Sequence, residues 1–269
     1  MIIPIFISMK PVKILLFVAG CFMSVTSFAQ SAKAIEADLL SSFNKLEYWD
    51  HLQRKGTNGA SDSLETANDV FEAKLKNYTV KYPATITEPF TALKKAHMDI
   101  FTSGDGLFRI YSWETWMGGT MRDFSNLMQY KTGQTTKAVL YTTTADVYVP
   151  FYSNLYTFKN GAKTYYLGIY NGIYSTKDVS TGIKIFAIEN GKLNDDIKLI
   201  KTQSGLRNKL SYNYDFFSVV DIAIELRPTI TFDEATKTIK LPLVNSKGAI
   251  TGKFILYKFN GQYFEKVKN

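Results

Sequence analysis

Residues 165–170 read YYLGIY, and this stretch decides the fold class of the chain. Aromatic and β-branched residues favour extended backbone, and the same composition returns at residues 108–113 and 183–188. No helical pattern alternates with these runs, so they predict an antiparallel sheet and not a parallel one. Turn signals separate the runs at Asn160-Gly161, Asn171-Gly172, Asn190-Gly191, Asn260-Gly261 and Gly104-Asp105-Gly106.

Residues 230–241 predict a further hairpin, with a turn at residues 233–236 and alternating apolar residues on both arms. A weak repeat also runs through the region: an aromatic residue, an apolar residue two positions later, and then Asn-Gly. Its copies end at Gly161, Gly191 and Gly261, so their spacing is irregular. Any antiparallel sheet with Asn-Gly hairpins gives such a pattern, and a small β-propeller-like repeat is the alternative architecture.

Residues 30–97 carry helical periodicity, with apolar residues at spacings of three and four. Residues 56–60 break the first helix. Asp62 as N-cap, with Glu65 three positions later, predicts the start of a second helix, and Pro83 ends it. A third, short helix is expected to open at residues 88–89. The apolar stripes of the two longer helices are Ile35, Leu39, Phe43 and Leu46, and Ala67, Val70, Phe71 and Leu75.

The change of period near residue 98 predicts an α+β fold. Helices over residues 30–97 would pack against an antiparallel β-rich region over residues 98–269, and both would form one compact domain.

Residues 1–29 have the pattern of a secretory signal. Lys10 and Lys13 form a positive region, an apolar run follows to residue 25, and Ser27 and Ala29 fit the small-residue rule for signal peptidase. We therefore expect a secreted or periplasmic mature chain that begins at Gln30. The alternative is a lipoprotein, because residues 18–21 read VAGC and resemble a bacterial lipobox, in which Cys21 would be acylated.

The net charge and the number of cysteines limit the partners and the reactions that the chain can have. The chain has 32 basic and 24 acidic residues, a net charge of +8, which suits acidic polymers or an anionic membrane surface. The lysines are scattered, so most are expected on solvated faces. Cys21 is the only cysteine, so a chain cleaved after Ala29 would have no disulfide and no thiolate. No later apolar run approaches the ~20 residues of a membrane span, so none is expected in the mature chain.

The densest group of candidate binding residues lies within residues 108–123. Strand alternation would place the side chains at 109, 111 and 113 on one face, and Gly118-Gly119 permits a turn or a close approach of a ligand. Aromatic rings beside guanidinium and carboxylate groups suit a sugar or an extended polymer. The structural alternative is a strand with its tryptophan in the core and its arginine paired at the rim. The candidates are Arg109, Tyr111, Trp113, Glu114, Trp116, Arg122 and Asp123.

The same segment carries a resemblance. Residues 108–113, FRIYSW, followed by GGTM at residues 118–121, resemble a segment of uncharacterised secreted Bacteroidota proteins. The resemblance spans about fifteen residues and implies no activity.

The sequence contains no motif for a glycosidase, zinc or serine-hydrolase site. Asp105, Glu114 and Asp123 are the nearest carboxylates for a glycosidase pair, but their spacing does not distinguish them. His51 and His97 are the only histidines, and neither stands in a zinc or serine-hydrolase motif. We therefore expect no metal and no cofactor.

Two hypotheses of function follow. The first is a non-catalytic secreted or periplasmic protein that binds a glycan or envelope polymer through an aromatic face, to which the seven tyrosines of residues 148–174 would contribute. Nucleic acid is not expected as a partner of an exported protein. The second is a carboxylate-dependent hydrolase of a cell-envelope or dietary polymer. A concave cleft that holds two of the three carboxylates named above would favour the enzyme, and a flat or convex aromatic face would favour binding.

Overall fold

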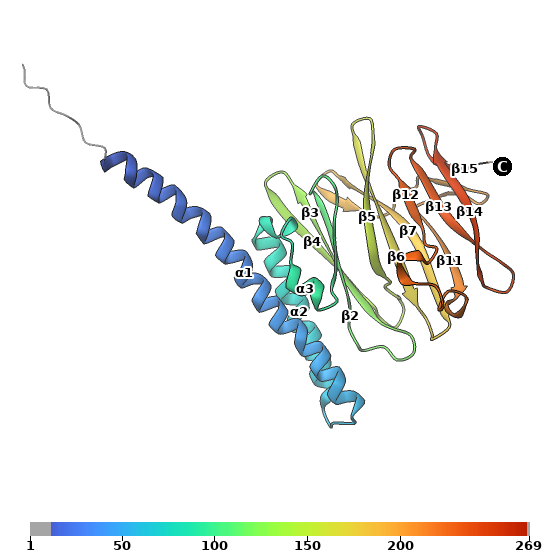
Figure 1. Cartoon of the computed structure of the whole chain (residues 1–269), viewed down its shortest axis with the longest axis horizontal. Coiled ribbons are helices and arrows are strands. Elements are labelled where there is room, and N and C mark those ends of the chain that lie inside the picture. Colours follow the sequence, from blue (N-terminus) through green and yellow to red (C-terminus); the bar gives the residue numbers. More distant parts are fainter. Residues whose placement is uncertain (1–11, 268–269) are drawn as a thin grey trace, which may run out of the picture.

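A layer of helices forms the N-terminal side of the molecule (Figure 1). In the computed structural model the backbone is described for residues 12–267, and side chains are described for residues 32–267 except Glu225. The helices are α1 (Val12–Arg54), α2 (Ala60–Lys81) and α3 (Thr91–Lys95), with the 3-10 turn η1 (Pro83–Ile86) between the last two. Within the described residues, no helix combines the length and apolarity that a membrane crossing requires.

The predicted signal overlaps the first part of α1. The side chains of residues 12–29, including Cys21 and Ala29, lie outside the described residues, as does the whole of residues 1–11. Cleavage after Ala29 and acylation of Cys21 therefore stay predictions.

The apolar stripes of α1 and α2 face each other and the first sheet, because all their members except Val70 belong to one buried cluster; Val70 is 42 % exposed, so its place in the stripe was predicted wrongly. Polar contacts add to this packing: Asp38 of α1 accepts hydrogen bonds from Lys74 Nζ at 2.7 Å and from the Tyr78 hydroxyl at 2.9 Å.

The prediction that Asp62 is the N-cap of the second helix was wrong. Gly59, with a φ of 72°, precedes the first residue of α2, so Asp62 lies inside the first turn. Glycine adopts this left-handed backbone without steric penalty.

Three sheets follow. The first has the order β1 (Asp99–Thr102), β2 (Phe108–Glu114), β3 (Phe124–Thr132) and β4 (Thr135–Thr142). The second has the order β11 (Lys209–Asp215), β7 (Asp178–Glu189), β6 (Lys163–Ile173) and β5 (Phe151–Asn160), and β8 (Lys192–Asn194) also pairs with β7. The third has the order β10 (Gly205–Arg207), β9 (Ile200–Thr202), β15 (Phe264–Lys266), β14 (Ile250–Phe259), β13 (Thr238–Val244) and β12 (Thr231–Asp233).

Every strand pair is antiparallel except β9 with β15, so the α+β prediction with an antiparallel β-rich region is confirmed. The hairpin expected at residues 230–241 is also confirmed, since Phe232 of β12 pairs with Ile239 of β13.

The sheets are stacked as layers beneath the helices. One buried cluster lies between the helices and the first sheet, a second between the first and second sheets, and a third between the second and third sheets. The middle sheet is therefore buried on both faces, with Tyr166 and Phe186 facing one neighbour and Leu167 and Ile185 the other. This open stack differs from the closed ring of blades in a propeller, so the propeller-like alternative was wrong.

Burial on both faces also explains the tyrosine-rich stretch. Tyr152, Tyr166 and Tyr170 lie in the core between the first two sheets and do not form an exposed binding face. The Tyr170 ring lies so close to Gly182 that a Cβ there would stand 2.1 Å from it.

Three of the predicted Asn-Gly turns occupy hairpins: Asn160-Gly161 joins β5 to β6, Asn190-Gly191 joins β7 to β8, and Asn260-Gly261 begins the connection from β14 to β15. All three glycines have a positive φ. Asn171-Gly172 is different, because it lies inside β6. A Cβ on Gly172 would come within 2.8 Å of Ser180 Oγ, so that glycine permits close side-chain packing and not a turn.

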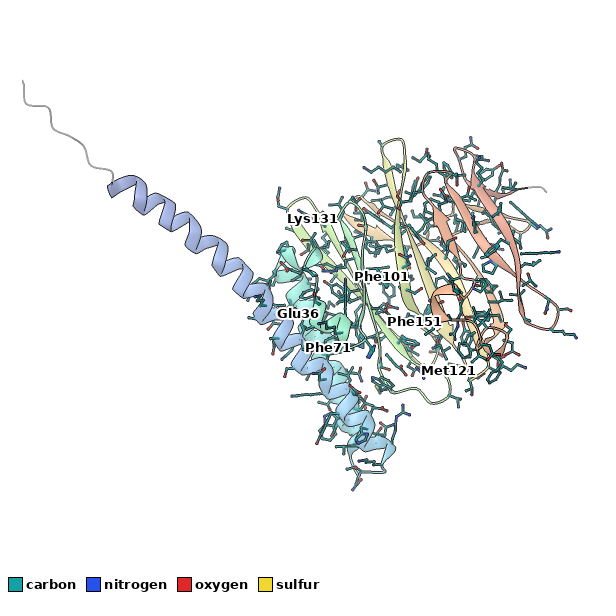
Figure 2. All side chains as sticks on the ribbon, in the orientation of Figure 1. Glu36, Phe71, Phe101, Met121, Lys131 and Phe151 are labelled. Atoms are coloured by element: carbon teal, nitrogen blue, oxygen red, sulfur yellow. The ribbon has the colours of Figure 1, made fainter. Side chains whose placement is uncertain are left out.

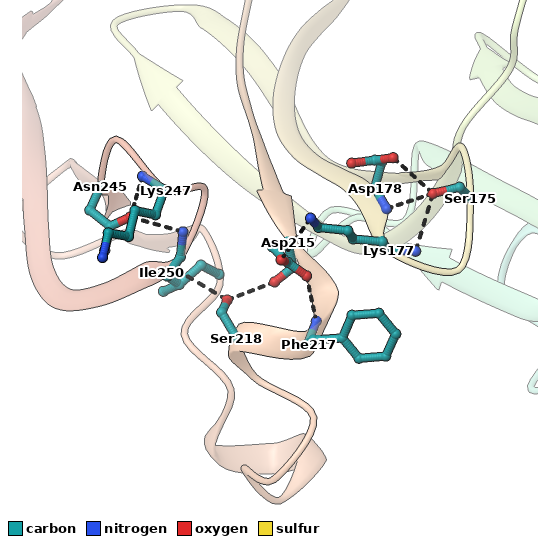
Figure 3. A network of polar contacts seen from close by, with 10 residues as sticks. Ser175, Lys177, Asp178, Asp215, Phe217, Ser218, Asn245, Lys247 and Ile250 are labelled. Carbon is teal, nitrogen blue, oxygen red and sulfur yellow. Dashed lines mark hydrogen bonds and ion pairs between the residues drawn. The ribbon is translucent and has the colours of Figure 1, made fainter.

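The long connection from β11 to β12 is fixed at its base by polar contacts (Figure 3). Asp215 accepts a hydrogen bond from the Phe217 amide at 2.9 Å and pairs with Lys177 at 3.4 Å. Ser218 Oγ donates to the Asp215 carbonyl and accepts from the Ile250 amide. This network ties the connection to both the second and third sheets.

Candidate functional site

A cleft of about 360 Å³ opens at one end of the first sheet, where α1, the start of β1 and the end of β2 meet the second sheet. Figure 2 labels Phe151, which belongs to its lining, and Met121 in the adjacent turn. Its volume lies within the range of small-ligand sites. The cleft is lined by Phe43, Asn44, Glu47, Ala96, His97, Asp99, Trp113, Glu114, Trp116, Arg122, Phe124, Phe151 and Ile173.

Aromatic rings make the apolar walls of the cleft. The rings of Phe124 and Phe151 are 4.8 Å apart, which joins the first sheet to the second at this point. Trp113 belongs to the core as well as to the wall, because its ring meets Phe71 of α2 edge-on at 5.2 Å. The alternative interpretation, in which the tryptophan of this strand is a core residue, is therefore correct for Trp113.

The turn after β2 presents Trp116 and Arg122 to the cleft. Trp116 has a φ of 61°, an unusual backbone for a bulky side chain that persists only where the surroundings impose it. The turn is tight, since a Cβ on Gly118 would lie 2.3 Å from the Met121 carbonyl oxygen. The Thr115 amide donates to the Asp123 carbonyl at 2.9 Å and closes the turn.

Two contacts position these side chains. Arg122 Nη1 lies 3.3 Å from Glu114 Oε2, and the Arg122 amide donates to the Ile173 carbonyl at 3.0 Å. The guanidinium of Arg54, at the end of α1, lies 5.8 Å from the centre of the Trp116 ring. The cleft mouth therefore combines an indole, two guanidinium groups and a carboxylate.

Two carboxyl groups of the cleft have raised pKa values. Burial raises the pKa of Asp99 to about 6, and the charge of His97 opposes part of that rise. Burial also raises the pKa of Glu114, against the opposing charges of Arg122 and Arg54. Both groups accept hydrogen bonds from hydroxyl groups, and the Asp99 carboxyl group also donates one below about pH 6.

The structure brings together four of the seven candidate residues: Trp113, Glu114, Trp116 and Arg122. The other three lie elsewhere. Tyr111 is buried and donates from its hydroxyl to Gln129 Oε1 at 2.9 Å, and Asp123 does not line the cleft. The predicted common face of Arg109, Tyr111 and Trp113 is present, but it faces the helices and not solvent.

Arg109 is the clearest departure from a ligand-binding role. Its side chain is 2 % exposed, donates to the backbone carbonyls of Thr85 and Glu88, and lies 5.3 Å from the centre of the Phe90 ring. These contacts fasten the segment between α2 and β1 onto the first sheet, so the arginine is paired in the interior and not at a rim.

Asp105, proposed beside Glu114 and Asp123 for a glycosidase pair, is a turn residue. It accepts hydrogen bonds from Ser103 Oγ at 2.6 Å, from the Leu107 amide and from the Tyr166 hydroxyl. Glu47 of α1 and Asp99 also line the cleft with Glu114, and the sequence suggested neither of them. Asp99 is the first residue of β1. Its partner in the β1–β2 register is Ser112, two residues before Glu114, and this register was the only signal that could have found it.

Among the described residues, no group of three His, Cys, Asp or Glu side chains is arranged to hold a metal ion. Comparison with known protein families, curated proteins and solved structures finds no match to this chain.

Proposed function

We propose that this chain is an exported, non-catalytic binding protein that holds a glycan unit, or the end of an envelope polymer, in the cleft. The observation that supports the proposal is the composition of the cleft mouth, where the Trp116 ring stands beside the Arg122–Glu114 pair. Aromatic rings stack on the apolar faces of sugars, and the fork of a guanidinium group matches hydroxyl or carboxylate oxygens. The carboxyl groups of Asp99 and Glu114 supply further hydrogen-bond acceptors.

Binding measured on two single variants tests this proposal. We expect Trp116→Ala and Arg122→Ala each to weaken binding to the recognised glycan at least about tenfold, because each removes one side of the cleft mouth. Melting of Arg122→Ala should change little, since the Arg122–Glu114 pair is half exposed on the arginine side. Trp116→Ala should melt somewhat earlier, because the indole also packs against the core cluster, so its binding is measured well below its melting temperature. The measurement is calorimetry against a panel of polysaccharides and envelope glycans.

Phe217→Ala and Arg207→Ala are the matched controls, because both side chains are exposed and neither lines the cleft. Wild-type protein that binds nothing on the panel, or cleft variants that bind as well as the controls, would contradict the proposal.

The raised pKa values of Asp99 and Glu114 favour the second candidate, a carboxylate-dependent hydrolase of such a polymer. Glu114→Gln separates the two functions. A binding protein should release no product from any glycan, before or after the substitution. A hydrolase should release sugar fragments that mass spectrometry detects, and Glu114→Gln should abolish that release.

The export of the chain rests on the signal pattern of residues 1–29. We expect N-terminal sequencing of the exported protein to begin at Gln30. Fatty-acid labelling that disappears in Cys21→Ala would show the lipoprotein form.

A further inference from the structure

We propose that the cleft binds an amino sugar and holds its free, protonated amine between the side chains of Asp99 and Glu114. Both residues line the cleft. Such a ligand rests on the proposed function and narrows it to one class of glycan, in which the amine carries no acyl group.

The strand register places the two carboxyl groups on one face of the first sheet. Asp99 of β1 is opposite Ser112 of β2, and Glu114 is two residues further along β2, so the three side chains point to the same side. That side faces the second sheet, because the Tyr152 amide of β5 donates to Ser112 Oγ at 3.0 Å. Diagonal neighbours on one face are about 7–8 Å apart at the backbone, so one small group can contact both carboxyl groups.

Both carboxyl groups keep free acceptor atoms within the described part of the chain. Asp99 forms no ion pair there, and no side chain donates a hydrogen bond to it. Arg122 is the only side-chain donor to Glu114, and it approaches Oε2, so Oε1 is open. Burial raises the pKa of Asp99 because it disfavours the ionised form, and a ligand cation would offset that cost.

Aromatic rings lie beside the two carboxyl groups. Phe124 is directly opposite Glu114 in the β2–β3 register, so its side chain is on the same face, and its ring is 4.8 Å from that of Phe151. The negative face of an aromatic ring attracts an ammonium group. A metal ion fits less well, because among the described residues no group of three His, Cys, Asp or Glu side chains is arranged to hold one. Rings and carboxyl groups together therefore suit an organic ammonium group.

The charge of the cleft lining is opposite to that of the chain. Three carboxyl groups and one guanidinium group line the cleft, whereas the chain has a net charge of +8. The charged residues of the lining are Glu47, Asp99, Glu114 and Arg122. His97 stands beside Asp99, and the ion pair of Arg54 with Asp50 lies near Glu114. A neutral sugar would leave the acidic lining uncompensated, and an acidic sugar would add to its charge, so the lining selects a cationic one.

Calorimetry with three trisaccharides that differ only at C2 tests the proposal. Cellotriose carries a hydroxyl group at C2, tri-N-acetylchitotriose an acetamide, and fully deacetylated chitotriose a free amine. At about pH 6.5 most of Asp99 is ionised, since its pKa is about 6, and the amine is largely protonated. We expect the amine form to bind at least about tenfold more tightly than either neutral form, because hydrogen bonds between ions are roughly twice as strong as neutral ones.

Asp99→Asn is the matched variant, because it removes the charge and keeps the shape. The preference for the amine form should fall below about threefold, and cellotriose binding should stay within about twofold of the wild type. The variant should melt no earlier than the wild type, since it removes a half-buried charge. Glu65→Gln is the control: it removes the same charge from an exposed residue of α2 outside the cleft and should keep the full preference.

Four results overturn the proposal: equal binding of charged and neutral trisaccharides, tighter binding of a neutral one, binding of none of the three, or equal loss of the preference in Asp99→Asn and Glu65→Gln. In the first two the proposed function stands, because the cleft then holds a glycan without selecting a positive charge. The proposed function fails on a different result, namely the absence of binding on the wider glycan panel, so the two failures are distinguishable.

Discussion

The first and third sheets are the two outer sheets of the stack, yet only the first carries a layer of helices on its outer face. In β2, the first six residues are all buried, whereas β14 is exposed or half-buried over most of its length. Under the helices, the sequence places polar side chains that bond to one another and to backbone, such as Gln129 with Thr79 and Thr85. On the third sheet it places unpaired lysines.

This difference shows what each outer face requires. A face covered by protein has to satisfy every polar group internally, because water does not reach it. A face that is left open keeps its charges solvated. We therefore expect large stability effects from substitutions on the first sheet and small ones from substitutions on the outer face of the third.

The largest effect is expected from Trp113→Ala. Truncation of this buried ring leaves a cavity beside Phe71, and such a change destabilises a protein by about 3–5 kcal/mol. Phe254→Ala on the third sheet should change the free energy of unfolding by less than about 0.5 kcal/mol. Urea denaturation of both variants measures the contrast. Equal losses would show that the outer face of the third sheet is covered in solution.

A smaller loss, about 2–4 kcal/mol, is expected from Arg109→Ala, because two backbone carbonyls lose a charged donor in the interior. Arg109→Lys should recover only part of it, since one ammonium group does not reproduce the two-pronged donation. Lys240→Ala is the matched cation on the third sheet and should be near neutral. Equal melting temperatures for Arg109→Ala and Lys240→Ala would contradict the stabilising role of Arg109.

The smallest effect concerns pH. The pKa of Asp99 is about 6 in the folded chain and near 3.8 when unfolded, so the unfolded state releases the proton first as pH rises. Ionisation of Asp99 therefore lowers stability progressively from about pH 4 to above pH 6, and the full penalty is present above that range. Asp99→Asn should raise the melting temperature at pH 7.5 and leave it nearly unchanged at about pH 4. If Asp99→Asn has the same melting temperature as the wild type at both pH values, the carboxyl group of Asp99 is not buried in solution.

Local patterns predicted the elements well. The spacing of Ile35, Leu39, Phe43 and Leu46 gave the buried face of α1, and Asn160-Gly161 gave the turn between β5 and β6, because both signals depend only on neighbours in sequence. Asn171-Gly172 misled for the opposite reason. Its glycine is required by Ser180, which approaches from the next strand.

The candidate site was predicted in part. Glu114, Trp116 and Arg122 stand on one short segment, so their proximity followed from the sequence. Asp99 joins them only through the order of strands and the end of α1, which no local pattern encodes. Arg109 and the tyrosines of β6 were misplaced because strand alternation does not say whether a second layer covers the outer face.

The pairing of β9 with β15 has a consequence for the order of synthesis. β9 ends at Thr202, and its neighbour in the sheet begins at Phe264, close to the last residue of the chain. The ribosome therefore delivers the second sheet well before the strand that completes the third one. Until the third sheet forms, Ile183 and Ile185 lack part of their cover, and the nascent chain is open to wrong partners. Completion of the third sheet requires residues 264–266, whatever the speed at which its hairpins form.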